Sequence, residues 1–560
     1  MDPDTRPDDA LAPGSDARHG TSRRRSNAER DAPAPIDGPD GHRDGWRRFA
    51  RRALGPLACL TAAVVVAACA TAADDAGDGA PPEPTAALAT EGSAAPPTDP
   101  DVATDPPAAA ASGSGDASGD APSYAHDIEP ILSSTCANCH IGSGPGTQHV
   151  RFDTAGIAAK SSAGIATVVG SGFMPPWPAS DDSVEFDHDW SLTDAQVRTL
   201  VAWDEAGSPL DVDEDREIVA SDAGVRLDDP TEVIASDGSY DGEVGQPDEY
   251  RCFVYELPTD DRGGFLTAMD FLPDQEVVVH HAVGFLVRDA DRDAIAELDD
   301  ADPGGGWTCF GFTPSPTAEL VYGWAPGQNA TRFGDGAGLR LEPGDLFVMQ
   351  THYHFDVEAP ADRSELAIEV VLDDEPGADR LTALDVQTLV GPAEIPCAPD
   401  ESGPLCERDA ALAAAVGRYG VTGAISNAIN AVCGFDASPD LLSADGIARS
   451  SCDQAVRTSG EIVALFGHEH ELGASFRMTL HPDTPDEVVL LDIPEWDFDW
   501  QLVYEPAEPI EVRAGDTVRL ECSWDRSRRD PDLEPAWVLW SEGTDDEMCF
   551  AMVTVRPDGA

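Results

Sequence analysis

Three stretches of this chain hold too few apolar residues to build a core, and they divide the rest into separately folding parts. Residues 1–46 are rich in Asp, Pro, Gly and Arg, residues 70–122 in Ala, Pro, Ser and Asp, and residues 211–245 in acidic side chains. Such segments cannot bury enough surface to order themselves and act as extensions or tethers. The 560 residues leave room for about two to four domains between them.

An apolar segment lies between the first two of these stretches. The basic residues 47–52 precede the apolar residues 54–68, which end in Val66-Ala67-Ala68-Cys69. A basic flank, a short apolar run and small residues before a break are the parts of a secretory signal, and the run is too short to span a membrane comfortably. Because its end resembles a lipobox, we expect residues 1–69 to be a disordered extension with a lipoprotein signal, and Cys69 to be lipidated. An uncleaved anchor with a chance cysteine is the alternative.

This signal predicts an exported protein that is lipid-anchored to the cell envelope, at the periplasmic face or the cell surface. The charge of the chain restricts its other partners. Asp and Glu number 105 against 35 Lys and Arg, for a net charge of −70. So large a negative charge argues against nucleic acid as a partner.

Residues 123–210 are expected to form a small, mostly α-helical domain that carries haem. The motif Cys136-Ala137-Asn138-Cys139-His140 is the attachment pattern of c-type haem. Two thiols three positions apart on a helix can add to the vinyl groups of one haem, and His140 then reaches the iron. A zinc site or a redox dithiol is the alternative, but zinc would need a second pair of ligands nearby.

The sixth iron ligand is expected to be Met174, which stands in the Pro-rich segment Gly172-Phe173-Met174-Pro175-Pro176. His149 and His188 are the alternatives. Ligation by His and Met raises the reduction potential of a haem and suits electron transfer. The sequence therefore predicts a c-type cytochrome domain with one covalently bound haem.

Beyond residue 245, short Val-, Phe- and Thr-rich runs alternate with Pro, Gly and Asp turns, which predicts an all-β region. Its histidines cluster as His280-His281, as His352 with His354, and as His468-Glu469-His470. Side chains at i and i+2 share one face of a strand, so His468 and His470 can converge. The adjacent His280 and His281 would need a bulge or a strand end to do so. One such cluster alone is more often structural than metal-binding, but three together favour a metal.

These segments resemble the copper type II, ascorbate-dependent monooxygenases, the family of peptidylglycine α-hydroxylating monooxygenase and dopamine β-monooxygenase. The likeness covers about residues 245–555, in the order of the family's motifs. Its matching segments are Val279-His280-His281-Ala282, Tyr322-Gly323-Trp324-Ala325-Pro326-Gly327, Gln350-Thr351-His352-Tyr353, Gly467-His468-Glu469-His470, Ala514-Gly515-Asp516-Thr517 with Cys522, and Asp546-Glu547-Met548-Cys549.

The resemblance implies two jelly-roll-like β-sandwiches, residues 246–390 and 391–560, with one copper ion on each and an open cleft between them. The first copper, on His280, His281 and His352, would store and deliver an electron. The second copper, on His468, His470 and Met548, would bind O2 for the hydroxylation of a C–H bond in a small organic substrate. The haem or reduced ascorbate would supply electrons, and a periplasmic donor would feed them in.

The substrate expected from the resemblance is not peptidylglycine. The positions that hold the peptide carboxylate in the family are Phe466, Phe550 and Met552 here, which leaves no charge to pair with it. These residues favour a less polar substrate. Glu469 and Glu471 could attract an amine, but an equally good interpretation makes them solvated strand residues.

The remaining cysteines are expected to form disulfides, because eight of them are spread through an exported domain. The resemblance implies a bond between Cys522 and Cys549, and Cys397 with Cys406 would close a short local loop. Cys433 could pair with Cys452, and Cys252 would pair with Cys309 only by elimination.

Two other functions remain open at this point. The chain could be a non-catalytic haem–copper lipoprotein that transfers electrons or binds copper. Alternatively, its histidines could be structural, with haem as the sole cofactor.

Overall fold

The computed structural model describes residues 121–558 apart from positions 143, 188, 221–225, 228, 237, 245, 260–261, 276, 310–314, 316, 327, 329, 335, 356–359 and 421. The expected N-terminal extension, the signal segment with Cys69 and nearly all of the linker that follows lie outside the described residues. In the part of the chain that is described, no helix has the length and apolar character needed to cross a membrane.

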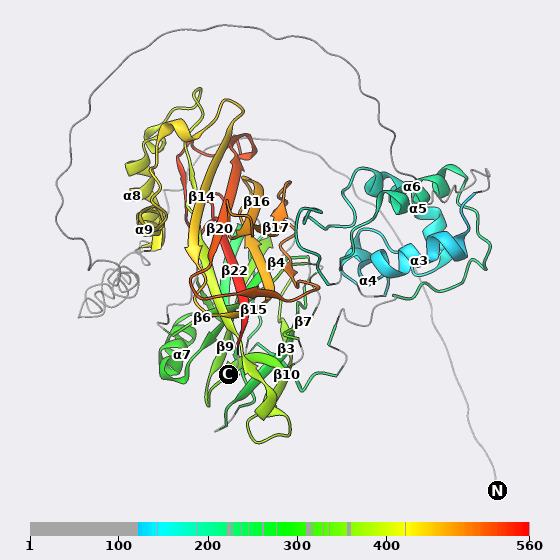
Figure 1. Cartoon of the computed structure of the whole chain (residues 1–560), viewed down its shortest axis with the longest axis horizontal. Coiled ribbons are helices and arrows are strands. Elements are labelled where there is room, and N and C mark those ends of the chain that lie inside the picture. The colour runs from blue at the N-terminus through cyan, green and yellow to red at the C-terminus, as the bar shows by residue number, and fades with distance from the viewer. Residues whose placement is uncertain are drawn as a thin grey trace, which may run out of the picture. The chain divides into compact units, whose positions relative to one another are not determined.

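Residues 123–220 form a helical part of the chain (Figure 1). Its core holds the buried side chains of Tyr124, Leu132, Phe152 and Trp203. The segment up to Ile218 packs on this core, and the backbone N–H of Ile218 donates to the Asp153 carbonyl at 2.9 Å. The helical part therefore extends into the stretch expected as an acidic linker. Its helical elements are η2 (Tyr124–Ile128), α3 (Glu129–Ile131), η3 (Leu132–Cys136), α4 (Ala137–His140), η4 (Pro145–Gln148), α5 (Ala155–Gly170) and α6 (Asp194–Glu205).

The first β-rich part contains two sheets. One has the order β1-β10-β3-β8-β11, with β7 on β3, and the other has the order β5-β2-β9-β4-β6. All pairs are antiparallel except β11 with β8. The strands are β1 (Glu232–Ala235), β2 (Gln246–Glu256), β3 (Gly264–Leu272), β4 (Val279–Val287), β5 (Trp307–Thr308), β6 (Glu319–Trp324), β7 (Thr331–Arg332), β8 (Ala337–Leu341), β9 (Leu346–Phe355), β10 (Glu365–Leu372) and β11 (Thr382–Ala383), with α7 (Arg292–Ala301) after β4.

The second β-rich part also contains two larger sheets, ordered β12-β22-β15-β18 with β19 on β15, and β14-β20-β16-β17. The helices α8 (Arg408–Tyr419) and α9 (Ile425–Cys433) run along one side of it, drawn in yellow in Figure 1. The strands are β12 (Asp385–Val390), β13 (Glu394–Ile395), β14 (Ile447–Ala455), β15 (Gly460–His468), β16 (Gly473–Leu480), β17 (Val488–Ile493), β18 (Val503–Tyr504), β19 (Ile510–Val512), β20 (Thr517–Asp525), β21 (Val538–Leu539) and β22 (Phe550–Pro557).

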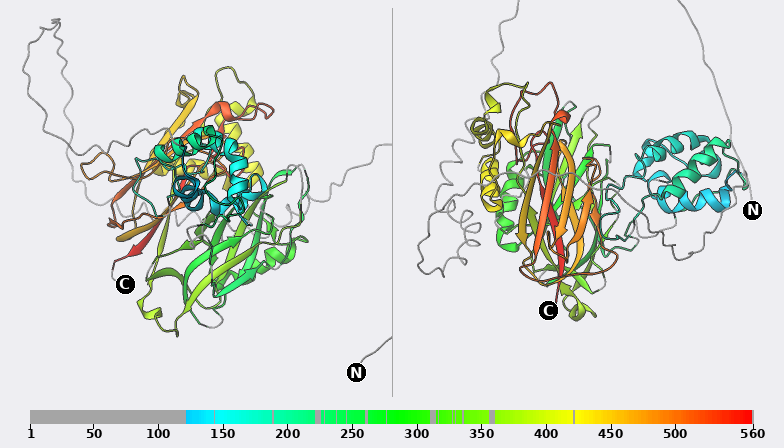
Figure 2. Two further views of the ribbon diagram at one scale, coloured as in Figure 1. Left: turned by 90° about the vertical axis from the view of Figure 1, so that its right-hand side faces the viewer. Right: turned by 45° about the horizontal axis from the view of Figure 1, so that its top comes forward.

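Each β-rich part is a sandwich, because one core joins the inward faces of its two sheets. Figure 2 shows the strands of both parts in two further views. In the first, Phe347 and Tyr353 of β9 share a core with Phe271 and Ile368 of the other sheet. In the second, Leu465 and Val553 share a core with the opposite sheet, which includes Leu520. The alternation of apolar residues along these strands thus builds two separate all-β cores.

The sandwich boundaries differ from those expected at two places. Strand β1 lies inside the segment expected as a linker and pairs with β10. Strand β12 lies before residue 391 yet pairs with β22 of the second sandwich. Both strands are short and lie at the edge of a sheet. Composition had assigned β1 to a linker, and the resemblance had assigned β12 to the preceding sandwich.

Four disulfides join the eight cysteines of the sandwiches: Cys252 with Cys309, Cys397 with Cys406, Cys433 with Cys452, and Cys522 with Cys549. Cys136 and Cys139 take part in none of them.

The segment after Met174 lies against the second sandwich. The Ser180 N–H donates to the Asp492 carbonyl at 2.8 Å, and the Trp177 ring contacts the Tyr504 ring with centroids 5.3 Å apart. Phe186 forms an isolated bridge with Pro506. These contacts tie the loop of the helical part to strands β17 and β18.

Candidate metal centre

His280, His281 and His352 meet because of a bulge at the start of β4. His281 lies opposite His352 on β9, and the register shifts between Val279 and His281, so that His280 has no partner residue on β9. A bulge re-aims the extra residue, and adjacent side chains can then face the same side. This is the irregularity that the sequence required for joint ligation by neighbouring histidines.

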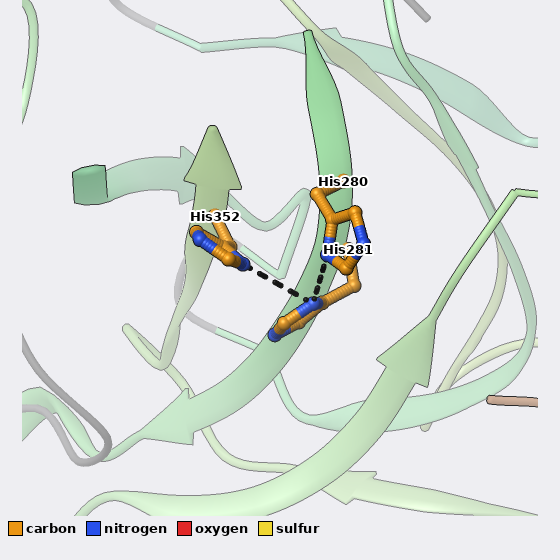
Figure 3. Close-up of side chains that lie close together, drawn as sticks. All are labelled: His280, His281 and His352. Carbon is orange, nitrogen blue, oxygen red and sulfur yellow. Dashed lines mark hydrogen bonds between the residues drawn. The ribbon is translucent and has the colours of Figure 1, made fainter. Parts of the chain in front are cut away.

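The three imidazoles converge through their Nδ1 atoms (Figure 3). The Nδ1 atom of His281 lies 3.0 Å from that of His280 and 3.4 Å from that of His352. The second ring nitrogen of His280 faces the Asp499 carboxylate at 3.2 Å, which orients this ring. Among the described residues, these three can offer one atom each to a single ion, all within 4.8 Å of one another. Imidazole suits copper and zinc, so the donor set fits a copper ion.

The second donor set comes from three separate places in the second sandwich and consists of His468, His470 and Met548. His468 ends β15, His470 lies in the turn before β16, and Met548 precedes β22. The two imidazole centroids are 5.0 Å apart, and all three side chains line one pocket. The convergence expected from the i, i+2 spacing is therefore present, although His470 lies just beyond the strand.

Each of these two imidazoles has one nitrogen held by an oxygen acceptor. Nδ1 of His468 is hydrogen-bonded to Oε1 of Gln501, and Nδ1 of His470 to the Asp546 carbonyl at 3.2 Å. An acceptor at Nδ1 places the proton there and leaves the lone pair on Nε2, as is usual for metal-ligating histidines. Two such nitrogens with a thioether nearby form a donor set that fits copper, particularly Cu(I).

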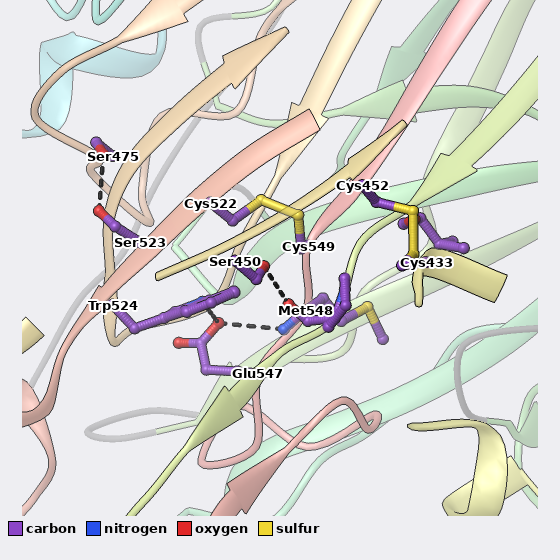
Figure 4. The surroundings of a disulfide bond; sticks show 12 residues. Cys433, Ser450, Cys452, Ser475, Cys522, Ser523, Trp524, Glu547, Met548 and Cys549 are labelled. Atoms are coloured by element: carbon purple, nitrogen blue, oxygen red, sulfur yellow. Dashed lines mark hydrogen bonds between the residues drawn. A yellow bond between two sulfur atoms is a disulfide. The ribbon is translucent and has the colours of Figure 1, made fainter. Parts of the chain in front are cut away.

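The buried carboxylate of Glu547 connects the two segments that carry these donors. Figure 4 shows its hydrogen bonds to Met548 and Trp524. Its Oε2 accepts from the backbone N–H of His470 at 2.9 Å, the N–H of Met548 at 3.1 Å and the indole N–H of Trp524 at 3.0 Å. Its Oε1 accepts from the Leu472 N–H at 2.6 Å. Burial raises the pKa of Glu547 to about 8, although the four N–H donors act in the opposite direction.

The two candidate sites lie side by side. The ring centroids of His281 and His468 are 6.2 Å apart, and both side chains line the same pocket. Phe498 lies within 6.2 Å of His281 and of His470, measured between ring centroids. The structure thus differs from the open cleft that the resemblance implied. Between the two sites, the apolar walls of both sandwiches meet the loop that carries Phe498 and Gln501.

The walls of this pocket are mainly apolar. Phe466 and Phe550 line it, as expected from their positions beside the donors, whereas Met552 is buried opposite Phe466 on the neighbouring strand and is absent from the lining. Glu469 is fully buried, so its interpretation as a solvated strand residue was wrong; Glu471 is exposed.

The orientation of His140 in the haem motif fits ligation of a haem iron. Nδ1 of His140 is hydrogen-bonded to the Val150 carbonyl at 2.8 Å, which leaves Nε2 as the nitrogen for an iron atom. Cys136 and Cys139 lie in the helical elements η3 and α4, and burial raises the pKa of the Cys136 thiol to about 12. Met174 is half-buried after α5, beside the exposed Phe173. His149 is exposed, and His188 lies outside the described residues.

Several residues of the candidate centre lie outside the sequence motifs and were not predicted from them. Gln501, Phe498 and Asp499 belong to an irregular loop between β17 and β18, where sequence carries no periodic signal. Tyr250, whose ring stacks on His352 with centroids 4.3 Å apart, looks like an ordinary strand aromatic. Glu547 could have been found, because it stands directly before Met548.

Without metal, His468 and His470 are expected to contribute stability that is lost as the pH falls below 6.5, whereas the raised pKa of Glu547 contributes in the opposite direction. Burial lowers the pKa of His468 to about 4 and that of His470 to about 3, so between these values and 6.5 the unfolded chain binds protons that the folded chain does not. The contribution of these two histidines to stability then rises with pH across this window, and it is read as the difference between the unchanged protein and the variant below. Urea midpoints of the metal-free protein at pH 4.5 to 7 test this, and His470→Asn should make the dependence shallower. An unchanged slope in this variant would contradict the prediction.

Comparisons with known proteins identify no family. No family model and no curated protein matches the chain. Among solved structures, the allantoicase of Saccharomyces cerevisiae is similar at 8% identity with a TM-score of 0.14, over 57% of this chain and 80% of that one. The oxalate decarboxylase of Bacillus subtilis is similar at 8% identity with a TM-score of 0.11, over 61% of this chain and 80% of that one.

Proposed function

We propose that this chain is a copper-dependent monooxygenase that hydroxylates a C–H bond of a small substrate with O2, using electrons that pass through a c-type haem on the same chain. One observation carries the proposal: His281 of the first histidine set and both histidines of the second set line a single pocket, and Met548 is in its wall. One copper would be held by His280, His281 and His352, and the other by His468, His470 and Met548. A protein that only stores copper has no need of two unlike sites.

Copper bound at these positions would supply one-electron transfer and O2 chemistry, and the residues around it would set the conditions for both. Gln501 and the Asp546 carbonyl fix the orientation of the two imidazoles of the second site. The side chains of Phe466, Phe550 and Trp324 make the pocket apolar and exclude water from it. The net reaction would place one oxygen atom in the substrate and release the other as water, which consumes two electrons and two protons.

The electron supply is assigned to the helical part. Cys136, Cys139, His140 and Met174 would hold the haem. The segment that follows Met174 contacts β17 and β18, and β18 pairs with Phe466 of β15, two residues before His468. This continuity supports a relay from the helical part to the second site. We further propose that the protein is exported and lipid-anchored through Cys69, with a periplasmic donor as its source of electrons.

Metal analysis and O2 uptake of the purified full chain test the proposal. We expect two copper ions and one iron per chain, and O2 uptake by the reduced protein that is stimulated by at least one member of a panel of small amines, thioethers and aromatics. Copper without substrate-stimulated uptake would favour the non-catalytic haem–copper protein. Iron without copper would exclude both and leave the histidines structural.

A further inference from the structure

The loop between α5 and α6 carries Met174 and is long for a connection without regular structure. It comprises residues 171–193, and its described residues hold no helix and no strand apart from the isolated bridge at Phe186. Loops longer than about 12–15 residues without secondary structure are uncommon in compact domains and usually have a function. On the side of α5, the Met174 N–H donates to the Val168 carbonyl at 3.2 Å. The loop beyond Met174 is held by a different part of the chain.

Residues 177–187 of this loop, called the strap from here on, lie along the second sandwich. Strands β17 and β18 are each the last strand of their sheet, and the strap bonds to β17 and to the segment that follows β18. An extended segment that adds to a sheet edge in this way is fixed by main-chain hydrogen bonds. Four such bonds join the Ser180 N–H to the Asp492 carbonyl at 2.8 Å, the Val184 N–H to the Val489 carbonyl at 3.1 Å, the Asp187 N–H to the Glu505 carbonyl at 2.8 Å and the Ala507 N–H to the Glu185 carbonyl at 2.9 Å.

Side chains fasten the strap at two further points. The buried Asp492 carboxylate accepts from the Ser180 hydroxyl at 2.6 Å, and its other oxygen accepts from the Arg477 guanidinium at 2.9 Å. The rings of Trp177 and Phe186 lie against the buried ring of Tyr504, with centroids 5.3 and 5.0 Å away, and pack on the core of the second sandwich. By its contacts, the strap is therefore part of the second sandwich, although its sequence lies within the helical part.

The position of the strap restricts the position of Met174. Met174 stands three residues before Trp177, and three residues of extended chain span at most about 11 Å. A thioether is an uncharged ligand, and its apparent affinity for a metal falls with the fraction of time for which the chain presents it correctly. Holding Trp177 and Ser180 in place removes backbone freedom that ligation by Met174 would otherwise have to remove.

We propose that the second sandwich positions Met174 as the sixth ligand of the haem, with Trp177, Ser180 and Asp492 as positioning residues that act through the strap. This inference rests on the haem assignment within the proposed function and is independent of the two copper sites. Ligation by His and Met raises the potential of a haem, so the high potential would require the strap to be bound to the sandwich. Because coupling is reciprocal, ligation by Met174 would strengthen the binding of the strap by the same factor.

Variants of the haem-loaded full chain test the inference. Ser180→Pro removes the N–H and the hydroxyl that bond to Asp492, and Trp177→Ala removes the ring that contacts Tyr504. In the double variant, we expect the loss of the sulfur-to-iron charge-transfer band of the ferric haem and a lower reduction potential in a potentiometric titration. In each single variant, imidazole should displace Met174 at an about 10-fold lower concentration, the effect of losing one or two hydrogen bonds or a comparable contact.

Two control variants separate positioning from general damage to the loop. Ser180→Thr keeps both bonding groups. Ser191→Pro places the same proline at an exposed position of the same loop, where the N–H donates to the Asp189 carboxylate at 2.7 Å. Both controls should keep the band and the potential. Iron content must stay at that of the unchanged protein, so that a lost band does not reflect lost haem. If the double variant does not fold, Trp177→Ala and its imidazole titration still decide.

The outcomes distinguish this inference from the copper proposal. An unchanged protein without the band, or strap variants that behave like Ser191→Pro, would overturn the inference. Copper with substrate-stimulated O2 uptake, together with a band that the strap variants leave unaltered, rejects the inference alone. A band that is lost in the strap variants and kept in both controls supports it even where no copper is bound.

Discussion

Met548→Leu is expected to weaken the retention of Cu(I) at the second site and to lower substrate-stimulated O2 uptake by at least about 100-fold. Loss of a residue that only hydrogen-bonds to a metal ligand already lowers affinity or activity by about 10- to 100-fold, and Met548 is proposed to be a ligand itself. Leucine keeps the approximate volume of the side chain, so the apolar wall of the pocket is preserved. The change removes the sulfur, which is the donor that favours Cu(I) over Cu(II) and zinc. Copper content after dialysis of the reduced protein against a Cu(I) chelator measures the first effect, and an oxygen electrode the second.

Met478→Leu is the matched control. Met478 is fully buried on β16 of the same sandwich and does not line the pocket. Its replacement should leave copper content and O2 uptake close to those of the unchanged protein. If Met548→Leu held Cu(I) as well as Met478→Leu does, the thioether would not be a ligand and the second site would have to be reassigned.

The spacing of the histidines in the sequence predicted which of them lie close together. The i, i+2 spacing predicted that His468 and His470 converge, and they do so although His470 lies in the turn just beyond the strand. The same rule showed that His280 and His281 need an irregularity, and the register shift in β4 provides it. The two sandwich cores likewise follow from alternating apolar residues in the strands.

The relation between the two sites could not be derived in this way. It depends on where the loop with Phe498 and Gln501 lies, and that loop has no repeating pattern to read. It also depends on contacts between residues far apart in the chain, such as the hydrogen bond of 3.2 Å between the Tyr250 hydroxyl and Thr544. Sequence motifs named the donors, but only the packing of the two sandwiches shows that His281 lines one pocket with His468, His470 and Met548.

Glu547 has a structural role, although it lies next to the proposed metal donor Met548 in the same motif. The sequence placed this residue next to Met548 without giving it a task. In the structure its carboxylate accepts from the backbone of His470, Leu472 and Met548 and from the indole of Trp524. Glu547 is therefore a positioning residue that holds the turn after β15 against the segment before β22. Both donor segments of the second site depend on it.

Glu547→Ala is consequently expected to lower the free energy of unfolding by about 4 kcal/mol or more, because four buried donors lose their acceptor at about 1–3 kcal/mol each before relaxation. Glu547→Gln should lose less, about 1–2 kcal/mol, since the amide oxygen can keep the three donors on Oε2 and only the Leu472 N–H meets an NH2 group. Urea unfolding of the metal-free full chain measures both values, and the retention of Cu(I) should weaken in the same order.

Glu521→Ala, on the exposed face of β20, controls for the loss of a carboxylate and should stay within about 0.5 kcal/mol of the unchanged protein. If Glu547→Ala does not fold, Glu547→Gln still carries the test through its copper retention. Should both Glu547 variants match Glu521→Ala in stability and in copper retention, Glu547 would not hold the two segments together. The geometry of the second site would then have to come from the Cys522–Cys549 disulfide, which fastens the segment of Met548 to β20 without reaching His470.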